Sequence, residues 1–337
     1  MINIGIIGAG RIGQVHAKSI ITGVPEAKIL SIADPYMPQQ TAEWAKRVGI
    51  EGIYLDHHEI LNDERIDAVL ICSSTDTHAS ISIEAIQKGK HIFCEKPIDH
   101  SLEKIAQVKK ALDSADKKLV YQVGFNRRFD HNFRAIREAV ENKTIGDLHF
   151  IRISSRDPEP PSPAYVKTSG GIFLDMMIHD LDMLRYLSGA EVAEVYAQGA
   201  VLIDPAIGEA GDVDTATVSA KLSNGALALI DNSRKAVYGY DQRAEAFGSK
   251  GSIQCENDKP STAILSTVDG VCTQKPLWFF LERYMEAYKA EIRSFVDCIK
   301  SGSDPEVGFE DGEISIRISL ACKKSLAENR SVKISEI

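Results

Sequence analysis

An acid and an imidazole stand four positions apart in the segment that runs from Gly170 to Asp182. The spacing of apolar residues predicts a helix over Phe173–Leu187, so Asp175 and His179 would project from one face of it. A carboxylate beside an imidazole is what a general base for alcohol oxidation needs. The carboxylate fixes the tautomer of the ring and stabilises the imidazolium that forms once His179 has taken a hydroxyl proton.

Two other interpretations of this pair remain open. Asp175 and His179 could be an ordinary pair on the surface of a helix. Together with Asp182 they could instead bind a metal ion through carboxylate and imidazole ligands. We see no further pair of ligands at a suggestive spacing in the sequence, so we expect no metal site.

A glycine-rich turn near the N-terminus indicates where a cofactor would bind. Gly8-Ala9-Gly10-Arg11-Ile12-Gly13 has the G-x-G-x-x-G pattern, directly after an expected strand and at the start of a helical pattern. In this pattern the first glycine makes the tight turn, the second lets a pyrophosphate approach, and the third packs helix on strand. We expect the N–H groups at the start of this helix to face the phosphates, and Gly8, Gly10, Arg11, Ile12 and Gly13 to bind a dinucleotide.

Asp34 stands at the end of the second expected strand, 21 residues beyond Gly13. A carboxylate at this place can accept hydrogen bonds from the ribose hydroxyl groups of an adenosine and would repel a 2′-phosphate. The expected cofactor is therefore NAD rather than NADP. The alternative interpretation of Asp34 is a turn residue before Pro35.

A lysine follows the fifth expected strand, in the sequence Cys94-Glu95-Lys96-Pro97. This is the carboxyl edge of a parallel sheet, where doubly wound proteins bind their ligands. A Lys–Pro bond adopts the cis form at modest cost, and such bonds often occur at functional turns. Lys96 would then be a cation fixed beside the nicotinamide, whereas the alternative is a solvated loop lysine.

The sequence predicts two different patterns of secondary structure, one in each part of the chain. Residues 1–123 alternate short apolar runs with amphipathic stretches, which predicts a doubly wound parallel sheet with right-handed crossovers, a Rossmann domain. The expected strands are Ile2–Ile7, Ile29–Ala33, Ile53–Leu55, Ala68–Cys72, His91–Cys94 and Leu119–Val123. The expected helices include Thr41–Val48, His78–Lys88 and Leu102–Ala115.

Residues 124–337 predict a second domain, of the α+β class, with a large, open and mostly antiparallel sheet. Its expected strands alternate in polarity with period two and are often joined by short turns: Asp147–Ser155, Val192–Val201, Val213–Leu222, Ala226–Ser233, Gln242–Gly248 and Ser252–Cys255. Helical patterns interrupt or follow them at Phe173–Leu187, Trp278–Lys300 and Gly312–Ala327.

Length and composition agree with a globular protein of this kind. The chain has 337 residues, of which 44% are hydrophobic and 26% charged. Its net charge of −9 argues against binding to nucleic acid or to an anionic membrane surface. Six cysteines are scattered without a Cys-x-x-Cys pair, and the N-terminus lacks a secretory signal. We therefore expect reduced thiols and a cytoplasmic location.

These features, in this order, resemble the Gfo/Idh/MocA family, which is named after glucose–fructose oxidoreductase and inositol dehydrogenase. The resemblance rests on Gly8–Gly13, Asp34, Glu95-Lys96-Pro97 and the Gly-Gly…Asp-x-x-x-His-Asp segment, and it covers nearly the whole chain. Three further stretches are similar to the inositol 2-dehydrogenases of that family: Val123–Asp130, Ser155–Pro158 and Val237–Asp241.

The resemblance implies roles for named residues. Lys96, Asp175 and His179 would form a catalytic trio, with His179 as the base and the other two assisting. Substrate contacts would come from Arg127, Asp157 and Tyr240, while Ser73, Thr75, His78 and Glu95 would lie along the cofactor. The family also implies a homotetramer packed through the large sheets of the second domain.

The implied activity is an NAD-dependent dehydrogenase that oxidises myo-inositol at C2 to 2-keto-myo-inositol, with His179 as general base. Some inositol dehydrogenases have a histidine where Ser155 stands, so the choice of inositol isomer is open. The alternatives are a scyllo-inositol dehydrogenase, another sugar or polyol dehydrogenase of this family, or a non-catalytic protein that binds NAD and senses a sugar.

Overall fold

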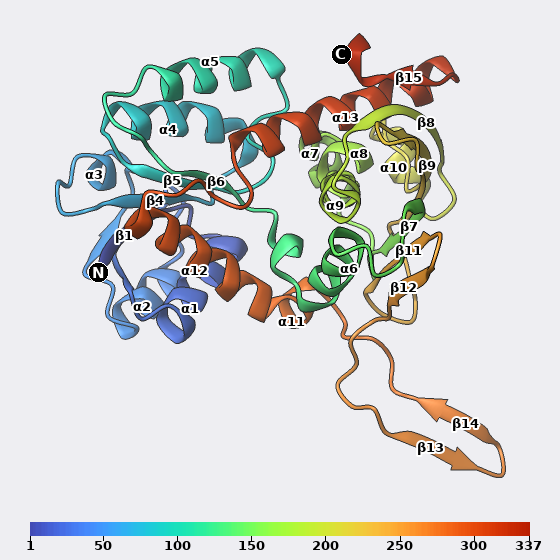
Figure 1. Ribbon diagram of the computed structural model, residues 1–337. Coiled ribbons are helices and arrows are strands. Elements are labelled where there is room, and N and C mark those ends of the chain that lie inside the picture. Colours follow the sequence, from blue (N-terminus) through green and yellow to red (C-terminus); the bar gives the residue numbers. More distant parts are fainter. The chain divides into compact units, whose positions relative to one another are not determined.

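The computed structural model describes residues 1–337, which divide into two compact units (Figure 1). The first unit consists of Met1–Phe129 and Met285–Ile314, and the second of Asp130–Tyr284 and Ser315–Ile337. None of the helices combines the length and the apolar character that crossing a membrane requires.

The first unit contains a six-stranded parallel sheet in the order β3-β2-β1-β4-β5-β6. Its strands are β1 Ile2–Ile7, β2 Ala27–Ala33, β3 Gly52–Tyr54, β4 Ala68–Ile71, β5 His91–Cys94 and β6 Tyr121–Val123. Its helices are α1 Arg11–Gly23, α2 Gln39–Arg47, α3 His58–Leu61, α4 Thr75–Gln87, α5 Leu102–Asp113, the 3₁₀ turn η1 Asn126–Phe129 and α12 Met285–Ser301. This order of strands is the one typical of dinucleotide-binding sheets, so the predicted Rossmann fold is confirmed.

Helix α12 returns from the far end of the sequence to complete the core of the first unit. Ile292, Phe295 and Val296 belong to the same buried cluster as Ile6 of β1 and Phe93 of β5. Figure 1 shows α12 beside α1, and the two helices pack together. The domain boundary expected between residues 123 and 124 stays a prediction. The compact units differ from the expected domains because α12, from the second half of the sequence, packs in the first unit. This placement depends on contacts between segments that are far apart in the chain.

The second unit contains a seven-stranded sheet in the order β12-β11-β7-β10-β9-β8-β15. Only β7 and β10 pair in parallel, so the expected mostly antiparallel sheet is confirmed. Its strands are β7 Leu148–Arg156, β8 Val192–Ala200, β9 Thr215–Leu222, β10 Leu227–Ser233, β11 Asp241–Gly248, β12 Gly251–Cys255 and β15 Val332–Lys333. A separate hairpin, β13 Ile264–Thr267 and β14 Gly270–Thr273, is exposed along both strands.

Helices cover one face of this sheet and leave the other face exposed. The helices of the second unit are α6 His131–Glu141, α7 Pro163–Ser169, α8 Ile172–Asp175, α9 Ile178–Ser188, α10 Pro205–Glu209, α11 Phe280–Arg283 and the 3₁₀ turn η2 Ile334–Glu336, while α13 Phe309–Glu328 begins in the first unit. Along β10 the residues alternate, so that Ala228 and Ile230 are buried whereas Leu227 and Leu229 are exposed. Phe247 of β11 is also exposed, on the same face as Leu227.

Two helices expected from the sequence are interrupted. The predicted helix Trp278–Lys300 is formed by α11 and α12, with Tyr284 between them. The predicted helix Phe173–Leu187 is likewise formed by α8 and α9. Here the N–H of Met177 bonds to the carbonyl of Ile172, five residues back, and the N–H of Asp180 then bonds only three residues back, to Met177. This irregular turn corrects the expectation that Asp175 and His179 lie on one regular helix.

Candidate active site

The glycine turn has the local geometry that a dinucleotide requires. Gly8 has φ of 102°, and a Cβ there would strike the backbone of Cys72, directly after β4. A Cβ on Gly13 would strike the carbonyl oxygen of Gly8, which explains how α1 can start so close to the turn. A Cβ on Gly10, by contrast, would meet no atom within 4 Å. Gly10 therefore leaves open space beside the first N–H groups of α1, and this fits a bound pyrophosphate.

Asp34 lies next to this turn, directly after β2. Its Oδ2 atom accepts a hydrogen bond from the N–H of Ala9 at 2.8 Å, and its Oδ1 atom accepts one from the N–H of Tyr36 at 2.8 Å. These two bonds hold the carboxylate at the carboxyl edge of the sheet, beside the glycine turn. The position fits the recognition of ribose hydroxyl groups, because a fixed anion accepts hydrogen bonds and repels an added phosphate.

The other predicted cofactor residues follow β4 and β5 at the same edge. Ser73 follows β4, and its hydroxyl lies 2.7 Å from that of Thr77 in α4, the helix that Thr75 begins. Glu95 and Lys96 follow β5, and the peptide bond between Lys96 and Pro97 is cis. The edge of the first unit thus brings together every residue that we expected to contact the cofactor.

His78 holds two of these turns together from α4. The ring is 1% exposed, and each nitrogen lies against a carbonyl oxygen: Nδ1 at 2.8 Å from that of Pro97 and Nε2 at 3.0 Å from that of Ser73. Both nitrogens must carry a proton to donate to two acceptors. Burial disfavours the charged ring, but the Cys94 sulfur and the two carbonyl groups outweigh it and raise the pKa of His78 to about 9.

The raised pKa predicts a pH-dependent stability. The contribution of His78 should be full below pH 6.5, the ordinary pKa of the ring, and should disappear as the pH rises through about 9, because only the folded state holds the extra proton in this range. We expect the free energy of unfolding to fall over this interval by more in the wild type than in His78→Gln. Parallel curves from urea unfolding of the two proteins would show that the buried ring is neutral.

In the second unit, Asp175 is fixed by two neighbours that the sequence did not indicate. The hydroxyl of Tyr165 donates to Asp175 Oδ1 at 2.9 Å, and Nη2 of Arg234 donates to Oδ2 at 3.1 Å. Arg234 also lies 3.6 Å from Asp157, a predicted substrate contact, and is only 3% exposed. The arginine therefore bridges a predicted catalytic carboxylate and a predicted substrate-binding carboxylate. His179 lies in the first turn of α9, after the irregular turn that follows Asp175 in the chain.

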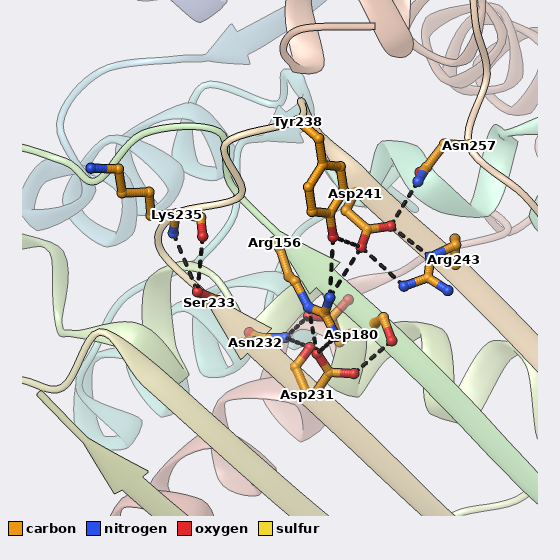
Figure 2. A network of polar contacts seen from close by, with 11 residues as sticks. Arg156, Asp180, Asp231, Asn232, Ser233, Lys235, Tyr238, Asp241, Arg243 and Asn257 are labelled. Carbon is orange, nitrogen blue, oxygen red and sulfur yellow. Dashed lines mark hydrogen bonds and ion pairs between the residues drawn. The ribbon is translucent and has the colours of Figure 1, made fainter. Parts of the chain in front are cut away.

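A second polar network fixes the strand end that carries Tyr240. Figure 2 shows Arg156 between two carboxylates, with Nε 2.7 Å from Asp231 and Nη1 3.4 Å from Asp241. Arg243 donates to both oxygens of Asp241, at 2.7 Å and 3.0 Å. Burial would raise the pKa of Asp241, but its hydrogen bonds, first that from Arg243, hold it below its usual value. Asp241 is thus a buried anion, and Tyr240 immediately before it has a fixed backbone.

The predicted site residues are distributed over both units. The first unit contains Lys96, the cofactor residues and Arg127, which lies in η1 and is 4% exposed. The second contains Asp175, His179, Asp157 and Tyr240. Ser155 is fully buried there and donates to Gln242 Oε1 at 2.9 Å.

Sequence reasoning missed Tyr165 and Arg234, and it also missed His16 in α1, which binds Glu95. Each of these residues is separated from its partner along the chain, and no short motif links them. In the sequence Arg234 directly follows an expected strand, and that position alone does not indicate that the side chain is buried.

Models of known protein families match both parts of the chain. A family model described as an oxidoreductase family with an NAD-binding Rossmann fold matches residues 2–125, and one described as a GFO/IDH/MocA C-terminal domain matches residues 133–254. The chain is 48% identical over 334 residues to a Myo-inositol 2-dehydrogenase of Thermotoga maritima, covering 99% of each chain.

Solved structures match over the same length. A probable dehydrogenase from Thermotoga maritima superposes with a TM-score of 0.96 at 48% identity and covers 100% of both chains. A scyllo-inositol dehydrogenase from Lactobacillus casei, solved with bound NAD(H) and scyllo-inositol, superposes with a TM-score of 0.91 at 31% identity and covers 99% of both chains.

Proposed function

The chain belongs to the GFO/IDH/MocA family of oxidoreductases, and from that premise we propose that it oxidises myo-inositol at C2 to 2-keto-myo-inositol with NAD as cofactor. The observation that carries this substrate is the 48% identity with a protein named Myo-inositol 2-dehydrogenase over 99% of both chains. The residues that the chemistry needs, Lys96, Asp175 and His179, are all present.

The proposed mechanism assigns one task to each of these residues. NAD, when bound, supplies C4 of the nicotinamide as the hydride acceptor. His179 removes the proton of the C2 hydroxyl group, and Lys96 donates a hydrogen bond to the oxygen on which negative charge develops. Asp175 is held by hydrogen bonds from Tyr165 and Arg234. Its negative charge stabilises the imidazolium of His179, which belongs to the same unit.

The remaining site residues would bind the two reactants. We propose that Asp34 accepts hydrogen bonds from the adenosine ribose and that the turn Gly8–Gly13 holds the pyrophosphate. Ser73, Thr75, His78 and Glu95 would line the cofactor site, His78 by holding two turns in place. Arg127, Asp157 and Tyr240 would contact the hydroxyl groups of the substrate, which both donate and accept hydrogen bonds.

A second candidate is the oxidation of scyllo-inositol. It is favoured by Ser155, which stands where some inositol dehydrogenases have a histidine, and by the similarity to a scyllo-inositol dehydrogenase at 31% identity. Ser155 is fully buried and its hydroxyl donates to Gln242, so it does not supply the imidazole that those dehydrogenases have at this position. The two isomers differ only in the configuration at C2, so the same residues could act on either.

A substrate screen separates these candidates. We expect the purified protein to reduce NAD with myo-inositol at a higher kcat/KM than with scyllo-inositol or D-glucose, and to prefer NAD to NADP by at least about tenfold, because Asp34 would lose ribose hydrogen bonds and face a phosphate. The measurement is the absorbance of the reduced nicotinamide. A higher kcat/KM with scyllo-inositol would favour the second candidate, and tight NADH binding without any turnover would indicate a sensor.

We further infer that the enzyme works in the cytoplasm, in the breakdown of inositol, as a homotetramer that packs through the large sheets. All six cysteines are free thiols, which suits a reducing compartment. The exposed face of the large sheet carries Leu227 (53% exposed), Leu229 (37%) and Phe247 (48%), and an apolar sheet face of this kind suits burial against a second copy.

A further inference from the structure

Two carboxylates flank one imidazole in the interior of the first unit, directly beside the turn that carries Lys96. His16 comes from α1, Glu95 follows β5, and Glu291 comes from the returning helix α12. His16 Nε2 lies 2.6 Å from Glu95 Oε1, and His16 Nδ1 lies 3.8 Å from Glu291 Oε1. His16 and Glu291 are fully buried, and Glu95 is 8% exposed. We call these three residues the buried triad.

The surroundings of the buried triad are aromatic and apolar. The rings of Phe93 and Tyr288 meet the His16 ring edge-on, with centroids 5.0 Å and 5.5 Å away. In such an environment two carboxylates that flank one ring disfavour each other's charge, which favours the neutral form of one of them. Burial, and then the charge of Glu95, raise the pKa of Glu291 well above its usual range. Glu291 is therefore the carboxyl group of the triad for which the neutral form is favoured.

The protonated acid faces an acceptor that lacks a hydrogen bond. Both carboxyl oxygens of Glu291, and Nδ1 of His16, are buried atoms without a hydrogen-bond partner. The contact between Nε2 of His16 and Glu95 Oε1 suits a ring that carries its proton on Nε2, and a neutral ring of this tautomer has Nδ1 as an acceptor. A carboxylic acid is a donor, and a small rotation that shortens the 3.8 Å separation to about 2.7 Å would satisfy both groups at once.

Glu95, the member of the buried triad that follows β5, forms a hydrogen bond with the backbone of Lys96. Glu95 Oε2 accepts a hydrogen bond from the N–H of Lys96 at 3.2 Å. The carboxylate also lies close to the backbone of Gly124, where only the missing side chain leaves room for it, because a Cβ there would come within 3.0 Å of Glu95. A shift of the Glu95 carboxylate would therefore move the turn on which the lysine stands.

We propose that Glu291 is a neutral acid that donates to His16, and that His16 in turn orients Glu95 and the Lys96 turn, so that His16 and Glu291 are positioning residues for the dehydrogenase reaction. This inference rests on the proposed function, in which Lys96 hydrogen-bonds the reacting oxygen. Such a contact requires the lysine to be held to within about 0.5 Å of its working position. Helix α12 thus takes part in catalysis without touching the substrate.

Two substitutions of similar size test the role of the proton on Glu291. Glu291→Gln keeps a neutral donor toward His16 Nδ1, and we expect its kcat to stay within about threefold of the wild type. Glu291→Met has no donor, which frees the ring to change its tautomer, and we expect kcat to fall by about tenfold or more with NADH affinity changed much less. Equal kcat values for the two variants would overturn the proposal.

A control separates positioning from stability. Val296→Ala removes buried volume five residues further along α12, so it should lower the melting temperature and leave kcat unchanged. Glu291→Met replaces a buried polar group with an apolar one and should keep or raise the melting temperature while it lowers kcat. If kcat follows the melting temperature across the three variants, the buried triad has only a structural role.

A measurement on the His16 ring tests the inference even if the protein proves inactive on polyols. Nitrogen-15 NMR of histidine-labelled protein, assigned with a His16→Gln variant, should show a neutral ring protonated at Nε2 in the wild type and in Glu291→Gln. Glu291→Met should show a different or mixed tautomer. An imidazolium, or a ring protonated only at Nδ1, in the wild type would overturn the proposal whatever the substrate is.

Discussion

Replacing His179 with alanine should lower kcat with myo-inositol by roughly 10²–10⁴-fold, which is the usual contribution of a positioned general base. The hydroxyl proton then has to leave without an acceptor in place. The affinity for NADH should stay nearly unchanged, because the glycine turn, Asp34 and the edge of the parallel sheet all belong to the first unit, whereas His179 belongs to the second. Turnover assays and titration of protein fluorescence with NADH measure the two quantities separately.

His149→Ala is a matched control for this change. His149 is an exposed histidine of β7 in the same unit, and its ring contacts only the exposed Phe247 among the aromatic neighbours. We expect this variant to keep the kcat of the wild type. An unchanged kcat in His179→Ala, or a parallel loss of turnover and of NADH binding, would show that His179 is not the base.

Replacing Asp130 with alanine should lower the free energy of unfolding by about 3–5 kcal/mol, the usual effect of breaking a buried ion pair. Asp130 and Arg283 are almost fully buried and meet through two hydrogen bonds, of 2.6 Å and 3.0 Å. The same carboxylate accepts hydrogen bonds from the N–H groups of Asn132 and Phe133 at the start of α6. The substitution therefore removes a helix cap and leaves the arginine with Asp258, which lies 3.0 Å away and is partly exposed, as its remaining anion.

Asp204→Ala separates the two effects. Asp204 caps α10 by accepting from the N–H of Ala206 at 2.9 Å, without a buried cation beside it. Loss of this cap alone should lower the free energy of unfolding by about 0.5–2 kcal/mol. Urea unfolding of both variants gives the difference. If Asp130→Ala is no less stable than Asp204→Ala, the buried pair with Arg283 adds nothing to stability.

Local patterns were sufficient to predict the architecture of both units. The strands of the first unit are short apolar runs, and the glycines between β1 and α1 follow directly from the turn they make. The alternation along β9 and β10 marks one covered and one exposed face of a sheet. Each of these patterns involves only a few neighbouring residues, so it can be recognised in the sequence before the fold is known.

The parts that could not be predicted depend on residues far apart in the chain. Helix α12 is amphipathic, but the positions of its apolar residues do not indicate which of the two sheets it packs against. The irregular turn at Met177 comes from hydrogen bonds that are set by packing, within a segment whose apolar spacing is helical. Arg234 and Glu291 are ordinary charged residues in the sequence, and their burial beside Asp175 and His16 is decided only when the strands and helices assemble.

The late position of α12 in the sequence also has a consequence for folding during synthesis on the ribosome. The wall of the nucleotide-binding core that Ile292, Phe295 and Val296 provide is translated after the whole of the large sheet except β15. A nascent chain that has emerged only as far as β6 lacks this wall and exposes the apolar flank of α1. Completion of the first unit therefore waits until α12 has been synthesised, and a chain that stops before Met285 would lack this wall.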